Sequence, residues 1–272
     1  MPEYICVTCG TEYPESASPP EHCLICEDER QYIGANGQQW TTLETLQGDH
    51  RNTIRVYEPN LLGIGTEPKF AIGQRALIVQ STGGNILWDC MTLLDESTIA
   101  AVTNLGGISA IAISHPQYYS TMVTWAHAFD APIYLHAADR QHVMRPDSSI
   151  HFWEGETKLL GGGITLINTG GHFAGGTVLH WAQGAEGRGA LLSGDIVNVV
   201  QDRRYVSFMY SYPNQIPLSA RAIRRIVASL EPFEFERIYS AWWDTITPKI
   251  GKEAVRFSAE RYIKAIEGTL TF

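Results

Sequence analysis

The sequence lacks any long hydrophobic segment. No uninterrupted apolar run in its 272 residues approaches the roughly 20 residues that a membrane-spanning helix needs. Its first residues, Met1 to Tyr4, also lack the basic segment followed by an apolar segment that is typical of a secretory signal peptide. These two absences predict a cytoplasmic protein that has no membrane partner.

Positive charge is scarce. The chain has 20 Lys and Arg residues against 29 Asp and Glu residues, which gives a formal net charge of −9. Because nucleic acids and anionic lipid surfaces repel an acidic chain, we expect neither as a partner. Apolar residues make up 44% of the sequence, and at this length they are sufficient for a sizeable buried core.

Cysteine is almost absent after residue 26. Four of the five cysteines form two Cys-x-x-Cys motifs, one at Cys6 and Cys9 and the other at Cys23 and Cys26. Two such turns can present four thiolates tetrahedrally, as structural zinc requires. The pattern predicts a four-cysteine zinc ribbon over residues 1–35. A rubredoxin-like iron site fits the same turns, and disulfide bonds are a third alternative that a cytoplasmic location disfavours.

Residues 36–272 are predicted to form one α/β domain. Short apolar segments separated by Gly and Pro indicate successive strands, and from residue 95 strands and helices alternate. Residues 28–48 show no such pattern and are interpreted as a connector. We expect strands over Thr53–Tyr57, Leu61–Ile64, Arg75–Gln80, Asn85–Asp89, Ala110–Ser114, Pro132–Leu135, Gly163–Asn168, Thr177–Trp181, Gly189–Leu192 and Arg237–Ser240, and helices over Asp95–Asn104, Tyr118–Phe129, Ser219–Leu230 and Glu253–Glu267.

Chemically active residues follow three of the expected strands. His115 begins the fragment HPQYYS, His172 lies in the fragment GGHFAGG, and Asp195 ends the fragment SGD. Two imidazoles and one carboxylate from three strand ends can bind zinc with an open position for water, or ferrous iron as a facial triad.

These fragments resemble, in this order, the ligand motifs of the metallo-β-lactamase superfamily. That family has an HxHxDH loop, a GH loop, a GD loop whose aspartate bridges two metal ions, and a late histidine. His115 matches the first histidine of HxHxDH, His172 matches the GH loop, and Asp195 matches the GD loop. The other three ligand positions of HxHxDH hold different residues here: Gln117, Tyr119 and Ser120.

The resemblance implies an αβ/βα four-layer sandwich preceded by the metal ribbon. The replaced ligands imply at most one active-site metal ion, zinc or iron, bound by His115, His172 and Asp195 with Gln117 as a weak amide donor. Asp195 would also accept a proton from the attacking water. The alternative is a site that binds no metal.

Three further residues are candidates for the surroundings of the metal. Asp89 ends a strand and resembles the family's aspartate that orients the ligands, although a carboxylate is also common in turns. Tyr119 can offer its phenol in place of the lost carboxylate, with core packing as the alternative. His136 follows a strand and can reach the pocket, with a structural histidine as the alternative.

The resemblance also implies an activity, namely metal-dependent hydrolysis of a small ester, lactone or thioester. Two alternatives stay open. The first is a non-catalytic binding protein whose only metal is the structural zinc, and the second is an iron-dependent redox member of the superfamily. A homodimer is implied by the resemblance alone.

Overall fold

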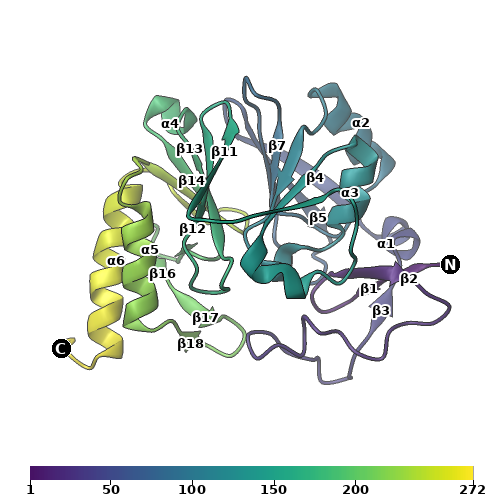
Figure 1. Ribbon diagram of the computed structural model, residues 1–272, viewed down its shortest axis with the longest axis horizontal. Coiled ribbons are helices and arrows are strands. Elements are labelled where there is room, and N and C mark those ends of the chain that lie inside the picture. Colours follow the sequence, from purple (N-terminus) through teal and green to yellow (C-terminus); the bar gives the residue numbers. More distant parts are fainter. Residues whose placement is uncertain (272) are drawn as a thin grey trace. The chain divides into compact units, whose positions relative to one another are not determined.

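A seven-stranded sheet organises the first of the two units into which the chain divides (Figure 1). The computed structural model describes residues 1–271, and this first unit comprises Met1–Leu135 and Arg140–Phe152. The strand order is β10-β9-β8-β7-β6-β5-β4. The strands are β4 (Arg51–Glu58), β5 (Leu61–Glu67), β6 (Ala76–Val79), β7 (Ile86–Trp88), β8 (Ala110–Ala112), β9 (Ile133–His136) and β10 (Ile150–Trp153).

The sheet of the first unit changes from antiparallel to parallel along its order. Strands β4 to β7 form an antiparallel meander, whereas β7, β8 and β9 are parallel. The parallel strands are connected by the helices α2 (Glu96–Asn104) and α3 (Met122–Phe129). Strands β6, β7 and β8 are buried along their whole length, which explains why they are continuous apolar runs rather than alternating patterns.

A three-stranded sheet of order β2-β1-β3 precedes this meander. Its strands are β1 (Glu3–Cys6), β2 (Glu12–Glu15) and β3 (Trp40–Thr41), and the helix α1 (Leu43–Asp49) follows. The interpretation of residues 28–48 as a plain connector is therefore wrong. Helix α1 buries only Leu46, so it has no apolar periodicity that the sequence could reveal. The domain boundary at residue 35 stays a prediction.

The predicted helix over Tyr118–Phe129 is interrupted in the structure. A 3₁₀ turn, η1 (Pro116–Tyr118), ends before Ser120, and α3 begins only at Met122. Ser120 has a left-handed backbone with φ of 44°. Because L-residues enter this region at a cost, tertiary contacts rather than local preference set this break.

The second unit comprises His136–Asp139 and the chain from Trp153 onward, and it has its own mixed sheet. The strand order is β11-β12-β13-β14-β19-β20, with β14 parallel to β19 and the other pairs antiparallel. The strands are β11 (Thr157–Gly161), β12 (Ile164–Asn168), β13 (Thr177–Trp181), β14 (Ala190–Gly194), β19 (Arg237–Ser240) and β20 (Ile246–Thr247). Two small hairpins accompany them: β15 (Asn198–Val199) with β16 (Val206–Ser207), and β17 (Met209–Ser211) with β18 (Ile216–Pro217).

Two long helices complete the second unit. Figure 1 shows α5 (Ala220–Leu230) and α6 (Gly251–Ile266) side by side, and a short helical segment, α4 (Gly184–Gly187), follows β13. The Ser219 hydroxyl begins α5 by accepting a hydrogen bond from the backbone of Ala222. Both predicted helices are confirmed to within two residues. Across residues 1–271, no helix combines the length and the apolar character needed to cross a membrane.

Candidate metal centres

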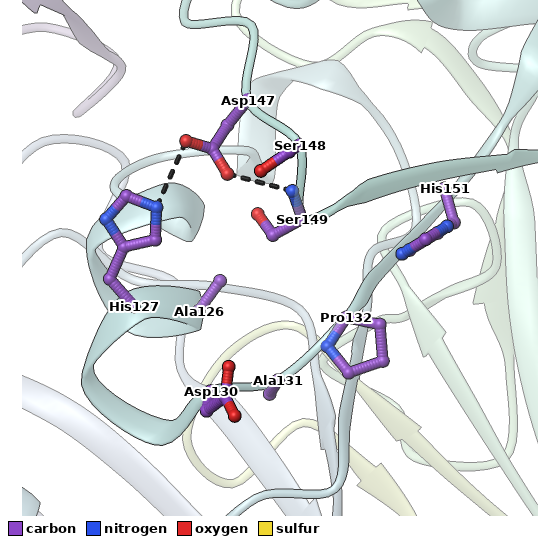
Figure 2. A pocket seen from close by; sticks show the side chains of 9 residues that line it. All are labelled: Ala126, His127, Asp130, Ala131, Pro132, Asp147, Ser148, Ser149 and His151. Carbon is purple, nitrogen blue, oxygen red and sulfur yellow. Dashed lines mark hydrogen bonds and ion pairs between the residues drawn. The ribbon is translucent and has the colours of Figure 1, made fainter.

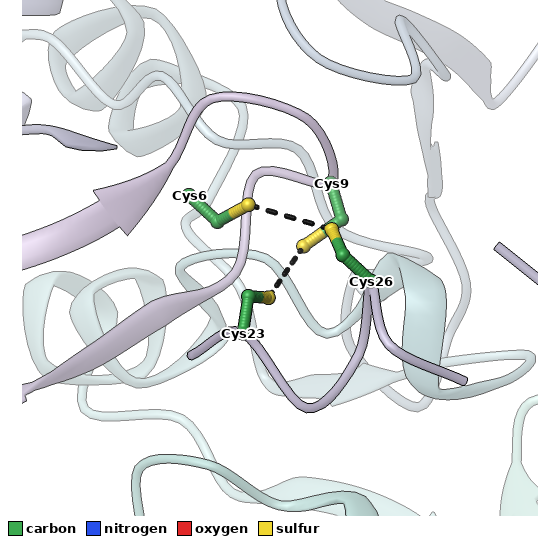
Figure 3. Close-up of side chains that lie close together, drawn as sticks. All are labelled: Cys6, Cys9, Cys23 and Cys26. Carbon is green, nitrogen blue, oxygen red and sulfur yellow. Dashed lines mark hydrogen bonds between the residues drawn. The ribbon is translucent and has the colours of Figure 1, made fainter. Parts of the chain in front are cut away.

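The four cysteines of the two Cys-x-x-Cys motifs lie together in the first unit (Figure 3). The Sγ atoms of Cys6 and Cys26 are 3.5 Å apart, and those of Cys9 and Cys23 are 3.6 Å apart. A disulfide needs a separation of about 2.05 Å, whereas four thiolates around zinc, with bonds of about 2.3 Å, are separated by roughly 3.8 Å. The geometry therefore matches a tetrahedral metal site, and the disulfide alternative is wrong because all four cysteines are free thiols.

Backbone hydrogen bonds shape both cysteine turns. The N–H of Gly10 donates to the carbonyl oxygen of Cys6 at 2.8 Å, and the N–H of Cys26 donates to that of Cys23 at 2.9 Å. Gly10 has φ of +81°, which glycine adopts without strain. Each turn thus points its two sulfurs toward the same place.

Side chains outside the motifs complete the surroundings of the sulfurs. The Nε2 of Gln38 donates a hydrogen bond of 3.1 Å to the sulfur of Cys6. Tyr13 accepts a hydrogen bond from the backbone of Leu24 and packs edge-on against Trp40, with ring centroids 5.0 Å apart. An amide donor to a thiolate stabilises its charge and tunes the metal that it binds. The sequence analysis did not identify Gln38, because its partner lies 32 residues away.

The titration behaviour of the thiols reflects their proximity. Hydrogen bonds from neighbouring thiols lower the pKa of Cys6 and of Cys23, whereas burial raises the pKa of Cys9. Because a metal ion is bound by thiolates, its binding to this cluster would release the protons of the thiols.

His115 and Asp89 are adjacent in the first unit. His115 follows β8, its side chain is buried, and its ring lies 4.3 Å from that of Tyr118 between centroids. The buried carboxylate of Asp89 accepts a hydrogen bond of 2.8 Å from the backbone N–H of Ser114. Asp89 therefore fixes the backbone directly before His115, as an orienting residue would.

The other two candidates of this segment are also buried. The Nε2 of Gln117 donates to the carbonyl oxygen of Arg30 at 3.5 Å, so its amide is engaged with the backbone that follows the cysteine motifs. Tyr119 lies in the core with 3% of its surface exposed. Whether Gln117 or Tyr119 contributes to a metal site stays a prediction.

His172 lies in the second unit, in the glycine-rich loop between β12 and β13. Its side chain is fully buried, and its Nδ1 lies 3.2 Å from the carbonyl oxygen of Met209. Because a carbonyl only accepts, Nδ1 carries the proton in this hydrogen bond, and the neutral ring then has its lone pair at Nε2. Fixing the tautomer through the distal nitrogen is typical of metal-binding histidines.

The glycines of this loop are required by close contacts. A Cβ on Gly176 would lie 2.7 Å from the carbonyl oxygen of Gly170, and one on Gly175 would lie 2.7 Å from the carboxylate of Asp139. Asp139 is buried and accepts a hydrogen bond of 2.9 Å from the N–H of Gly175. The sequence analysis did not identify this aspartate, which lies 36 residues before its partner.

Asp195 follows β14 and lies beside His172 in the second unit. A nitrogen of His172 and a carboxylate oxygen of Asp195 are within 4.8 Å of each other. The hydroxyl of Tyr212 donates a 2.7 Å hydrogen bond to the backbone oxygen of Asp195, and its ring lies 6.0 Å from that of His172. Burial, with the charge of Asp195, raises the pKa of Tyr212, so its phenol stays a neutral donor.

His136 has partners for both ring nitrogens in the second unit. Its Nε2 lies 3.1 Å from the carbonyl oxygen of Gly155, and its Nδ1 accepts a hydrogen bond from the N–H of Ala138. The ring also packs edge-on against Trp153. These contacts describe a structural histidine, and its predicted role in a pocket stays untested.

A pocket in the first unit contains none of the expected ligands (Figure 2). Its volume is about 360 Å³. In this pocket, the ring of His127 lies 3.0 Å from one carboxylate oxygen of Asp147. The other carboxylate oxygen accepts a hydrogen bond from the N–H of Ser149. Although burial opposes ionisation, these two contacts lower the pKa of Asp147.

Solved structures of metallo-β-lactamases align with most of the chain. The DIM-1 enzyme aligns with a TM-score of 0.57 and 15% identity over 77% of this chain and 97% of its own. A Cronobacter sakazakii enzyme with an HARLDQ motif aligns with a TM-score of 0.51 and 15% identity over 79% and 93%. A B3 metallo-β-lactamase with an active-site glutamic acid aligns with a TM-score of 0.52 and 15% identity over 85% and 97%. The protein has the metallo-β-lactamase fold, and the expected fold class is confirmed.

A closer relative is similar along the whole sequence. The uncharacterized protein YmaE of Bacillus subtilis (strain 168) is 53% identical over 272 residues, which cover 99% of each chain. The chain therefore belongs to the same family as YmaE. No family model matches the sequence.

Proposed function

We propose that this protein is a metal-dependent hydrolase with one active-site metal ion, bound by His115, His172 and Asp195. Three observations support the proposal. The fold is that of the metallo-β-lactamases, each of the three residues is buried in a segment that follows a strand, and their order along the chain is the order of the family's ligand motifs.

The observation with the greatest weight is the arrangement of His172 and Asp195 in the second unit. The carbonyl oxygen of Met209 holds the His172 ring, and a ring nitrogen of His172 lies within 4.8 Å of a carboxylate oxygen of Asp195. Both side chains are buried. Imidazole and carboxylate are donors that suit a divalent cation such as zinc or ferrous iron.

The proposed chemistry divides between the ion and the protein. A bound zinc or iron ion would polarise a carbonyl oxygen and lower the pKa of water. Asp195 accepts the proton of the attacking water at its carboxylate, and Asp89 holds the segment of His115 in place through Ser114. Because one ion stabilises less developing charge than two, we propose an activated substrate, namely a small ester, lactone or thioester.

The fragment HPQYYS is compatible with this reduced ligand set. The HARLDQ motif of the Cronobacter sakazakii enzyme likewise begins with histidine and has other residues at its third and sixth positions. The present chain differs further, because Tyr119 stands at the fifth position, where that motif has aspartate. We therefore propose one ion rather than two.

We propose that the four-cysteine ribbon binds a structural zinc ion. The separations of its sulfurs support a tetrahedral site, and zinc bound by four cysteines leaves no position for a substrate. Iron is the alternative, and absorption in the visible range by the purified protein distinguishes the two, because zinc thiolates are colourless. The homodimer and the cytoplasmic location stay predictions.

The proposed activity is tested by hydrolysis of a panel of chromogenic esters, lactones and thioesters. We expect the His172→Ala variant to lose at least about 100-fold in kcat/KM, because it removes a ligand of the ion that activates water. The matched control is His127→Ala, which changes an exposed histidine of the pocket in Figure 2. Equal activity in His172→Ala and the wild type, or no activity in either, would contradict the proposal and favour a binding protein.

A further inference from the structure

The cysteine ribbon and the segment of His115 are in direct contact within the first unit. We call residues 115–121 the His115 loop. The backbone N–H of Glu12, three residues after Cys9, donates a 3.1 Å hydrogen bond to the carbonyl oxygen of Ser120. Ser120 is buried, and its backbone is left-handed. It lies two residues before α3 begins. The contact is thus made at the strained position of the loop.

The side chain of Glu12 strengthens this contact. Only 3% of its surface is exposed, and both carboxylate oxygens accept a hydrogen bond from the Thr124 hydroxyl at 2.9 Å. Arg145 forms ion pairs with Glu12 and with Glu3. A buried, satisfied network of this kind holds its members in one arrangement, and it joins β1 and β2 of the ribbon to the first turn of α3.

A second connection passes through Gly10, which follows Cys9. A Cβ at Gly10 would lie 2.2 Å from the Thr92 hydroxyl, and that hydroxyl donates to the Gly10 carbonyl oxygen at 3.4 Å. The hydroxyl of Thr121, the last residue of the His115 loop, donates to the carbonyl oxygen of Thr92 at 2.8 Å. The shape of the first cysteine turn is therefore linked to the end of the loop.

A third connection comes from the second cysteine turn. The amide of Gln117 reaches the carbonyl oxygen of Arg30, four residues after Cys26. The guanidinium of Arg30 is in turn paired with the carboxylate of Asp28. Residues that follow the second cysteine turn thus contact the His115 loop near its start, and residues that follow the first turn are connected to its end.

We propose that the cysteine ribbon is a metal-dependent clamp on the His115 loop. The segment between the cysteine turns is short of apolar residues, so its shape depends on the ion that joins them. When the ion is lost, the three connections loosen and His115 loses its fixed position. Metal in the ribbon then controls the activity of the proposed active site, while His172 and Asp195 retain its ion, and this consequence alone depends on the proposed function.

The clamp is tested by amide hydrogen exchange of the full-length protein. Removal of the ribbon metal in Cys23→Ser should accelerate exchange of the amides of residues 116–122 by at least about tenfold. Exchange in the His172 loop, residues 169–176, should stay unchanged, because that loop closes on itself through Thr169, Gly170 and Gly176. Leu24→Ser is the matched control, since this exposed side chain lies in the same turn and is no ligand.

A chelator titration of His172→Ala, which lacks a ligand of the proposed active-site ion, keeps the test decisive if Cys23→Ser does not fold. Exchange of residues 116–122 should accelerate as the ribbon metal is withdrawn and slow again when zinc is restored. The Thr124→Val variant retains the ribbon metal but lacks the hydrogen bond to Glu12. It should accelerate amide exchange of the same residues to a smaller extent. Unchanged exchange in residues 116–122 after metal loss, or equal acceleration of residues 169–176, would overturn the clamp.

The exchange experiment is independent of the proposed hydrolysis. In His172→Ala, which removes a ligand of the second site, residues 116–122 should still respond to the ribbon metal. If that response is present while no substrate is hydrolysed, the clamp stands and the hydrolase fails. If hydrolysis is present and unaffected by the ribbon metal, while exchange does not respond, the hydrolase stands and the clamp fails.

Discussion

The cysteine ribbon and the pair of His172 and Asp195 are both candidate metal sites, but they gather their donors differently. In the ribbon, two short turns supply four sulfurs, and the outermost cysteines, Cys6 and Cys26, are 20 residues apart. His172 and Asp195 come from two loops that follow separate strands, β12 and β14. A site made of local turns takes part in folding its own segment, whereas a site at strand ends depends on sheets that fold without it.

The largest expected effect concerns the cysteine ribbon, whose metal is expected to take part in folding its own segment. Substitution of Cys26→Ser should remove most of the response of the melting temperature to zinc, because a structural zinc ion contributes on the order of 10 kcal/mol to small ribbons. Thermal unfolding followed by circular dichroism, with and without added zinc, measures the response. Leu24→Ser should respond as the wild type does, and a normal response in Cys26→Ser would show that the ribbon folds without metal.

The next effect concerns the orientation of His115. Asp89→Ala removes the acceptor for the Ser114 N–H, and we expect the second site to bind its metal about 10- to 100-fold more weakly while the ribbon metal is unchanged. Competition with a chromophoric chelator measures the affinity. Asp89→Asn is the control, because asparagine keeps an acceptor and tolerates the φ of 59° at this position. An unchanged metal affinity in Asp89→Ala would show that Asp89 stabilises the turn and does not orient His115.

A smaller effect tests the close packing of the His172 loop. Gly176→Ala places a Cβ 2.7 Å from the backbone oxygen of Gly170, which should lower the free energy of unfolding by about 1–3 kcal/mol. Urea denaturation measures the change. Gly48→Ala, where nothing lies within 4 Å of the added atom, should be neutral or slightly stabilising. Equal stability of the two variants would show that the His172 loop accommodates the added Cβ without cost.

The smallest effect concerns a helix that supplies no donor to either candidate metal site, and it is a reference for the other effects. Asp95 begins α2, and although burial opposes it, the hydrogen bonds from Thr98 lower the pKa of its carboxyl. The cap therefore stabilises the protein above the unfolded pKa of about 4 and is lost as the pH falls through the lowered folded value. Asp95→Ala should cost about 1 kcal/mol at pH 7. Asp95→Asn should keep most of the stabilisation by the cap without this pH dependence. If the stability of Asp95→Asn changed with pH as that of the wild type does, the Asp95 carboxylate would not be the source of the dependence.

Local patterns in the sequence predicted the elements whose signals are local. The cysteine spacing indicated the cluster, and the run at Thr177–Trp181 indicated β13 with its correct bounds. The left-handed backbone of Ser120 had no local signal, so the helix around it was predicted without a break. The Met209 carbonyl that fixes His172 lies 37 residues away, and such pairings arise only when the sheets assemble.

The metal content of the purified protein tests the central claim most directly. Elemental analysis should find two ions per chain in the wild type, one in Cys23→Ser and one in His172→Ala, because each variant removes a ligand from a different site. A single ion in the wild type that is lost in Cys23→Ser and retained in His172→Ala would contradict the second site, and with it the proposed hydrolase.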